Sequence, residues 1–164
     1  MFAKTVRHRR KARGMTAVEL LTAMVLLVIL AAFAVPSISP VVVRQRLSGA
    51  AWQLGGDLRL ARQRAVTERK RFRVCLTSCA ISVPAGSYSI ERDDGGWVSE
   101  AGVAVRLPPD VTVIASATAC FLPTGVLDSS CGLGSTFTLG NVMGTYEVRV
   151  ASTGRVRVCK GSCP

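Results

Sequence analysis

The sequence of 164 residues predicts an α+β protein, in which one long N-terminal helix packs on a small antiparallel β-sheet head with disulfides. Three observations predict this fold: an apolar run after a basic leader, a helical stripe of apolar residues beyond it, and short β-like runs that contain six cysteines. We therefore divide the chain into a leader (1–14), a transmembrane helix (15–35), an amphipathic helix (36–72) and a β head (73–164).

The apolar run at 15–35 is long enough to cross a membrane. Its only polar residues are Thr16, Glu19 and Thr22, and as a helix it measures roughly 30 Å, about one bilayer core. All leader cations precede it, which predicts a cytoplasmic N-terminus and an exported head. The alternative is a secretory signal cleaved after Ala34. That cleavage would discard Glu19, a carboxylate whose burial in lipid costs about 2.5 to 3.5 kcal/mol and therefore predicts a partner or a function.

The junction after the leader resembles the class III signal of type IV pilins and pseudopilins. It reads Gly14-Met15-Thr16-Ala17-Val18-Glu19-Leu20, with Met15 where the family usually has Phe. The resemblance implies that a prepilin peptidase cuts between Gly14 and Met15 and methylates the new amine. It further implies that Glu19 neutralises the N-terminal amine of a neighbouring pilin in a filament, and that Pro36, followed by Pro40, breaks or kinks the helix.

The same resemblance implies a location in the bacterial inner membrane before assembly, and afterwards in the pilus or periplasm and at the cell surface. Six of the 21 Lys and Arg residues lie in the leader, which leaves 15 against 10 Asp and Glu, a net charge of +5 after cleavage. This basic bias favours an acidic partner.

Apolar residues recur at helical spacing beyond Pro40 and predict one buried helix face. The many arginines between them are interpreted as a solvated face. The pair Gly55-Gly56 weakens the helix and is a candidate bend. The stripe consists of Val43, Leu47, Ala50, Leu54, Leu58, Ala61 and Ala65.

Short alternating or β-branched runs, separated by Gly, Pro, Asp and Asn, predict the strands of the head. A head of about 90 residues is near the lower size at which a core alone suffices, so cross-links would stabilise it. The predicted strands are 73–77, 88–92, 103–107, 111–115, 137–139, 146–151 and 155–159.

The cysteines fall into three close pairs, and an exported protein predicts disulfides whose connectivity the sequence leaves open. Bridges between cysteines four residues apart require turns, at 77–78 and 160–161, because an extended strand would hold them roughly 13 Å apart. Zinc is the disfavoured alternative, since structural sites more usually use paired C-x-x-C motifs, and we expect no metal or cofactor. The pairs are Cys75 and Cys79, Cys120 and Cys131, Cys159 and Cys163.

Two segments of the head repeat each other. Residues 71–79 and 155–163 both read Arg, apolar, Arg, Val, Cys, two residues, Ser, Cys. We expect the two strands to lie near one another and to present a shared basic surface, made of Arg71, Arg73, Arg155 and Arg157.

Three short motifs in the head resemble the GspH/FimT family, and in particular FimT-type minor pilins. They are Gly154-Arg155-Val156-Arg157 for the G-R-x-R motif, Phe121-Leu122-Pro123-Thr124-Gly125 for F-x-P-x-G, and Asp94-Gly95-Gly96-Trp97 for a G-W turn. With the pilin signal, the resemblance covers the chain from Gly14 on. It implies a minor pilin that binds extracellular DNA during natural transformation.

The resemblance places DNA binding on Arg155 and Arg157. Lys160 on the adjoining turn adds a third cation, and Arg71 and Arg73 are further candidates, because guanidinium groups engage phosphates well. No recognition helix is evident and aromatic residues are few, so binding is expected to be non-specific and salt dependent.

Two other functions share this fold and stay open: a structural or initiating minor pilin, and a type II secretion pseudopilin. For either, the Gly154–Arg157 segment is a solubilising hairpin. An enzyme is not expected, because His8 lies in the leader and the cysteines are expected to be paired. Asp93-Asp94 beside two glycines is typical of a turn.

Overall fold

The computed structural model describes residues 16–76, 79–100, 102, 104–115, 118–130 and 135–164, without the side chains of 32–39. These residues belong to two compact units, Met1–Ser39 and Pro40–Pro164. The expected processing site, Gly14 and Met15, lies outside the described residues. Each unit is described by itself.

The first unit contains the start of helix α1 (Ala17–Glu68). Thr16 caps the helix, because its Oγ1 accepts a hydrogen bond of 3.3 Å from the Glu19 N–H. The side chain of Glu19 is exposed, as are the apolar side chains from Val18 to Leu30. Within the described residues, no helix is both long and apolar enough to span a bilayer.

Helix α1 continues without interruption across Pro36 and Pro40, so it does not end at either proline. The boundary between the two units nevertheless falls directly before Pro40. The helix ends at Glu68 rather than at the expected residue 72, because Arg69 takes a left-handed conformation with φ of 54°.

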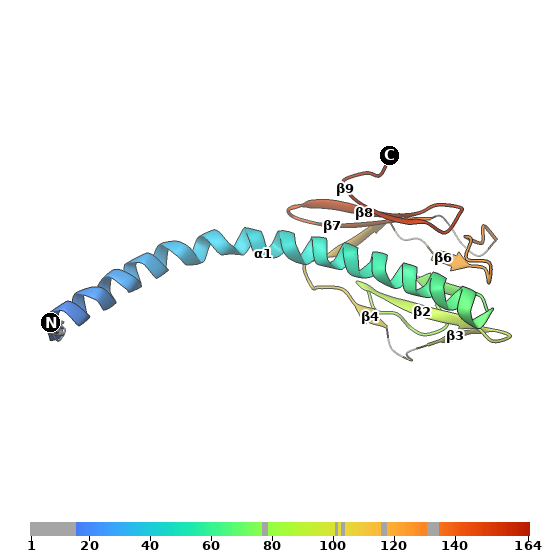
Figure 1. Ribbon diagram of the computed structural model, residues 1–164, viewed down its shortest axis with the longest axis horizontal. Helices are drawn as coiled ribbons and strands as arrows, with labels where there is room; N and C mark the ends of the chain where they lie inside the picture. The colour runs from blue at the N-terminus through green and yellow to red at the C-terminus, as the bar shows by residue number, and fades with distance from the viewer. Residues whose placement is uncertain (1–15, 77–78, 101, 103, 116–117, 131–134) are drawn as a thin grey trace, which may run out of the picture. The chain divides into compact units, whose positions relative to one another are not determined.

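Two antiparallel sheets make up the rest of the second unit (Figure 1). The order in the first sheet is β3-β2-β1-β6, with β4 paired to β2, and the order in the second is β5-β7-β8-β9. The first consists of β1 (Phe72–Cys75), β2 (Ser87–Asp93), β3 (Trp97–Ser99), β4 (Val105–Arg106) and β6 (Thr118–Phe121). The second consists of β5 (Thr112–Ala115), β7 (Thr136–Asn141), β8 (Gly144–Val150) and β9 (Val156–Lys160).

One hydrophobic core joins the second part of α1 to both sheets. Figure 1 draws β7, β8 and β9 on one side of the helix and β2, β3 and β4 on the other. The predicted stripe is buried from Leu47 to Ala65, and it meets Phe72 of the first sheet and Phe137 of the second. The α+β fold class predicted from the sequence is therefore confirmed.

Gly55 has a packing role in this core. A Cβ atom at Gly55 would lie 2.7 Å from Val158 Cγ2, closer than real contacts allow. A Cβ atom at the neighbouring Gly56 would have no atom within 4 Å. The absence of a side chain at Gly55 thus lets β9 approach the helix closely. The sequence suggested a bend here, and the observed role is close packing.

Two of the expected disulfides are formed within the described residues. Cys75 bonds to Cys79 and Cys159 to Cys163, with Cα atoms 5.9 and 5.4 Å apart. Gly161, with φ of 76°, makes the turn that closes the second bridge. Cys120 is also disulfide-bonded, and Cys131, the cysteine nearest to it in the sequence, lies outside the described residues.

Candidate nucleic-acid interface

The outer face of the β8–β9 hairpin carries three arginines. Side chains alternate along a strand, so the buried Val148, Val150 and Val156 point into the core. The residues between them face outward, and all three are exposed: Arg149, Arg155 and Arg157.

Arg149 stands directly opposite Arg157 in the register of β8 and β9. Like charges facing each other across two strands are destabilising. Within the described residues, neither guanidinium forms an ion pair with an Asp or Glu side chain. Arg149 Nη1 donates to the carbonyl oxygen of Cys163 at 3.3 Å and to an oxygen of Pro164, the last residue of the sequence, at 3.4 Å. The hairpin therefore holds two facing cations that no acidic side chain pairs with.

The three arginines border a hollow of about 620 Å³ that is also lined by Ser135 and Ser152. Its wall combines hydrogen-bond donors with positive charge, which suits an anion with several oxygen atoms. A second hollow, of about 730 Å³, lies between α1 and the start of β9. Arg155 lines both hollows.

Lys160 does not join this group. It follows Val156 and Val158 in the alternation of β9, so its side chain leaves the strand on the other face from Arg157. It is exposed and stands opposite Tyr146, and it lines neither hollow. The structure therefore does not place Lys160 beside Arg155 and Arg157, as the sequence analysis expected. The third cation on this face is Arg149.

The expected basic surface shared by the two repeated segments is not formed. Strand β1 lies between β2 and β6 in the first sheet, whereas β9 belongs to the second sheet. Arg73 pairs with the buried Glu91 at 2.6 Å and lies over the ring of Trp97, 4.3 Å from its centroid. The sequence repeat therefore reflects two similar disulfide-closed strands and not one binding surface.

Arg71 is also engaged by acids. Its guanidinium contacts Asp93 at 2.6 Å and Asp128 at 3.6 Å. The hydrogen bond to Asp93 is the largest cause that raises the pKa of Arg71 above its usual value. Because both arginines already pair with carboxylates, Arg71 and Arg73 are weaker candidates for DNA binding than the arginines of the β8–β9 hairpin.

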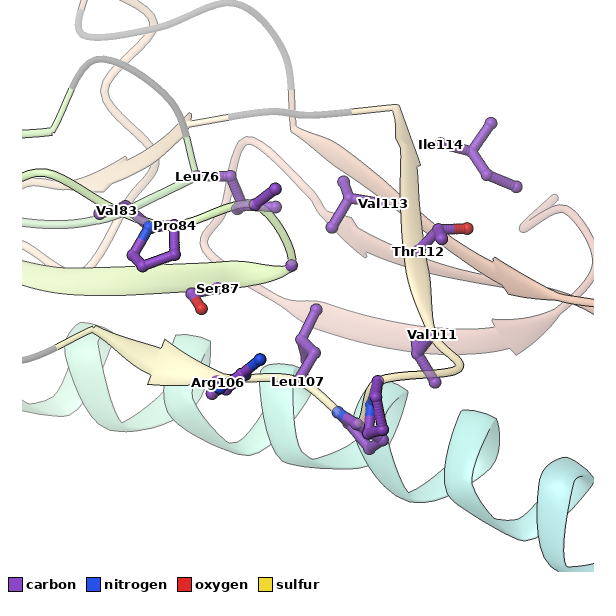
Figure 2. A pocket seen from close by; sticks show the side chains of 14 residues that line it. Leu76, Val83, Pro84, Ser87, Arg106, Leu107, Val111, Thr112, Val113 and Ile114 are labelled. Atoms are coloured by element: carbon purple, nitrogen blue, oxygen red, sulfur yellow. The ribbon is translucent and has the colours of Figure 1, made fainter.

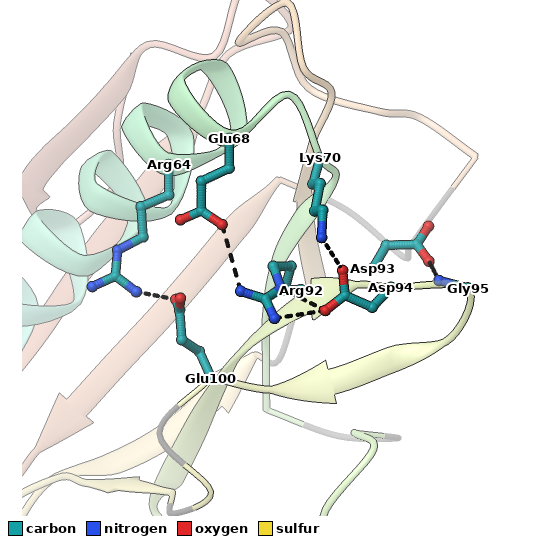
Figure 3. A network of polar contacts seen from close by, with 8 residues as sticks. All are labelled: Arg64, Glu68, Lys70, Arg92, Asp93, Asp94, Gly95 and Glu100. Atoms are coloured by element: carbon teal, nitrogen blue, oxygen red, sulfur yellow. Dashed lines mark hydrogen bonds and ion pairs between the residues drawn. The ribbon is translucent and has the colours of Figure 1, made fainter.

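A network of ion pairs connects the end of α1 to the β2–β3 hairpin (Figure 3). Arg92 bridges Asp94, at 2.6 Å, and Glu68, at 3.5 Å. Lys70 also pairs with Asp94. The hydrogen bonds from Lys70, and then from Arg92, lower the pKa of Asp94. This part of the head is consequently close to neutral despite its many cations.

The apolar hollow beside β4 and β5 offers little chemistry (Figure 2). It measures about 730 Å³ and is walled by residues such as Leu76, Leu107 and Val113, with Arg106 as its charged residue.

Cys75, Cys79 and Glu91 lie close enough together to suggest a metal site. The two thiols are joined in a disulfide and Glu91 is bound by Arg73 and by the Ala80 N–H, so they do not suit a metal.

Comparison with known proteins identifies the family. The model of the family described as type II transport protein GspH matches residues 50–160, about two thirds of the chain. The chain belongs to the GspH family. The match spans most of α1 in the second unit and both sheets, and it bears out the resemblance stated from the sequence motifs.

Among solved structures, a minor pseudopilin has a similar fold. The minor pseudopilin EpsH of the Vibrio cholerae type 2 secretion system is similar, with 14% identity, 70% of this chain and 97% of that chain covered, and a TM-score of 0.53. The minor pilin FimU of Pseudomonas aeruginosa is similar with 19% identity, coverage of 70% and 89%, and a TM-score of 0.46. No curated protein gave a match.

Arg149 is the site residue that sequence reasoning missed in this GspH-family protein. A signal was present, because Val148-Arg149-Val150 has the same apolar-basic-apolar alternation as Val156-Arg157-Val158. That pattern places Arg149 on a solvent face, but the register that sets it opposite Arg157 depends on the length of the turn between the strands.

Proposed function

We propose that this GspH-family protein is a minor type IV pilin that binds extracellular DNA without sequence specificity during DNA uptake in natural transformation. DNA contacts Arg149, Arg155 and Arg157 on the outer face of the β8–β9 hairpin. The protein is anchored in the inner membrane by residues 15–35 and is processed by prepilin peptidase at Gly14. It then assembles with other pilins through Glu19.

One observation carries the proposal: three exposed arginines share one face of the β8–β9 hairpin and, among the described residues, none of them forms an ion pair with an Asp or Glu side chain. Elsewhere in the head, cations such as Arg71, Arg73 and Arg92 are paired with carboxylates. A phosphodiester backbone supplies regularly spaced anions with two free oxygen atoms each, which a guanidinium can bind in bidentate fashion.

The hairpin lacks the means to read bases. Its exposed face holds arginines and small hydroxyl residues, and no helix of the described head is placed to enter a groove of DNA beside it. Affinity should therefore come from the phosphates and fall steeply with salt. With three phosphate contacts, the slope of log K against log salt is expected to be about −2.7 for duplex DNA.

The test is a binding titration of the full-length chain in detergent against a fluorescent duplex at low salt. Arg155→Ala with Arg157→Ala is expected to abolish measurable binding, since two of three phosphate contacts are lost. The matched control is Arg44→Ala with Arg106→Ala, which removes the same charge from two exposed positions far from the hairpin in sequence. Equal loss in both variants would show a bulk charge effect and sink the site assignment.

A second candidate function is supported by the family description and by the likeness to a secretion pseudopilin. For that function, the protein belongs to a type II secretion system and the arginines solubilise the hairpin. A structural or initiating pilin is the third reading. Deleting the gene separates them: normal filaments with lost transformation favour DNA capture, lost filaments favour a structural role, and lost secretion favours the pseudopilin.

A further inference from the structure

We propose that Arg62 of α1 is a positioning residue that locks the turn before β9 and thereby sets the place of Arg155. The inference rests on the proposed function for its effect on DNA, and on contacts in the second unit for its geometry. It concerns two loops that are far apart in the sequence: the F-x-P-x-G loop at 121–125, and the β8–β9 turn at 151–154.

Arg62 joins these two loops by hydrogen bonds to their backbones. Its Nε donates to the carbonyl of Gly125 at 2.8 Å, and its Nη2 donates to the carbonyl of Thr153 at 3.4 Å. Next to this bridge, the N–H of Leu127 donates to the carbonyl of Ser152 at 3.0 Å. One guanidinium and one backbone hydrogen bond thus hold the loop and the turn together.

The two glycines of the motifs touch each other at this point. A Cβ atom at Gly154 would lie 2.1 Å from the carbonyl oxygen of Gly125 and 2.8 Å from Arg62 Nε. A Cβ atom at Gly125 would lie 2.9 Å from Val66 Cγ2. Both glycines have positive φ, of 77° and 78°. The F-x-P-x-G and G-R-x-R segments therefore form a single contact around Arg62, and each glycine is needed to let the chains approach.

The position of Arg155 follows from this contact, since Arg155 is bonded directly to Gly154. Arg59, one turn earlier on α1, reinforces the arrangement by donating from Nη2 to the carbonyl of Val156 at 3.4 Å. Two of the N–H groups of Arg62, on Nε and Nη2, donate to carbonyl groups of the protein. It acts on DNA through the placement of Arg155, and not as a phosphate ligand.

The decisive experiment is a double-mutant cycle on DNA affinity with the full-length chain in detergent. Arg62→Ala is expected to weaken binding to the fluorescent duplex by roughly tenfold, as expected for loss of one charge-assisted contact. Arg155→Ala should weaken it to a similar extent. The double variant should bind within about twofold of either single variant, because both changes remove the same contact.

Two further variants separate positioning from charge. Arg62→Lys keeps the charge but cannot hold both carbonyls with a planar fork, so it is expected to behave like Arg62→Ala. Arg44→Ala removes an exposed cation of the same helix and should leave affinity within twofold. Additive losses in the cycle, or full binding by Arg62→Lys, would mean that Arg62 contributes charge alone and would overturn the proposal.

A measurement without DNA tests the positioning role of Arg62 independently of the proposed function. The Gly154 N–H donates to the carbonyl of Ala151 at 2.8 Å within the turn. Arg62→Ala should speed hydrogen exchange at the Gly154 and Leu127 amides while leaving β1 protected. Unchanged exchange at both amides would refute the positioning role. Retained DNA binding by the Arg155 and Arg157 double variant, with faster exchange in Arg62→Ala, would refute the DNA function alone.

Discussion

Arg149 and Arg157 are like-charged residues that face each other across β8 and β9. Opposite charges, or one charge and one neutral residue, would stabilise these facing positions, whereas two arginines repel each other. Local choices that oppose folding are expected at functional sites, where a ligand supplies what the protein lacks. At this hairpin, the ligand that we propose is the phosphate backbone of DNA.

Replacing Arg157 with threonine should separate stability from function. The change removes the repulsion and introduces a residue that favours strands, so the free energy of unfolding is expected to rise by about 0.2 to 1 kcal/mol. DNA affinity should fall in the same variant. Denaturant unfolding and the binding titration measure the two effects.

Lys160→Thr is the matched control for that change. It removes a cation from the same strand, but the residue opposite Lys160 is Tyr146, so no like-charge pair is relieved. If Lys160→Thr stabilises the protein as much as Arg157→Thr does, the gain comes from strand propensity and the repulsion is unimportant.

At the scale of elements, the contact between α1 and β9 organises the candidate site. The helix supplies Gly55 beneath Val158, and it supplies Arg59 and Arg62 to the carbonyl groups around the start of the strand. Strand β9 lies at the edge of its sheet and pairs with β8 on one side. Contacts with the helix therefore replace part of the support that a second neighbouring strand would give.

The two adjacent glycines of the helix provide a paired test of this contact. Gly55→Ala places a methyl group 2.7 Å from Val158 Cγ2 and is expected to destabilise the protein by about 1 to 3 kcal/mol through overpacking. Gly56→Ala meets nothing within 4 Å, so it should stabilise the helix by about 0.5 to 1 kcal/mol. Denaturant unfolding of both variants gives the measurement, and effects of equal sign would contradict the close approach of β9.

At the scale of the second unit, positive charge is distributed unevenly. Carboxylates pair with Arg73 and Arg92 of the first sheet and with Arg64 near the end of α1. The outer face of β8 and β9 has Glu147 as its acidic residue, and no ion pair of Glu147 occurs within the described part of the chain. The cations of this hairpin face therefore lack the paired carboxylates that accompany Arg73 and Arg92.

The paired carboxylates predict that acid weakens the fold. Folding lowers the pKa of Asp94, so its contribution to stability is complete above the unfolded pKa near 4 and is lost as the pH falls through the folded pKa. The thermal midpoint should drop between about pH 5 and pH 2. Asp94→Asn should be less stable at pH 7 and show a shallower decline. Glu147→Gln, without an ion pair to lose, should keep the wild-type profile.

The sequence predicted the helix face and the second sheet well, because the stripe from Leu47 to Ala65 and the run at 146–151 have clear periods. It missed β3 and β6, which are short strands without regular alternation. The mistaken grouping of Arg73 with Arg157 has a physical reason. A sequence repeat reports local structure, whereas the neighbours of each strand depend on which sheet it enters and on acids such as Glu91 that lie elsewhere in the chain.

Under the proposed function, the packing of Val158 against Gly55 has a mechanical consequence. A load applied to Arg155 and Arg157 pulls on β9, and the strand rests directly on α1 at this glycine. Tension would pass from the strand to the helix over a few ångströms of contact, without first crossing β8, β7 and β5. The force on the bound DNA would then be carried by helix α1 and not by the other strands of the sheet.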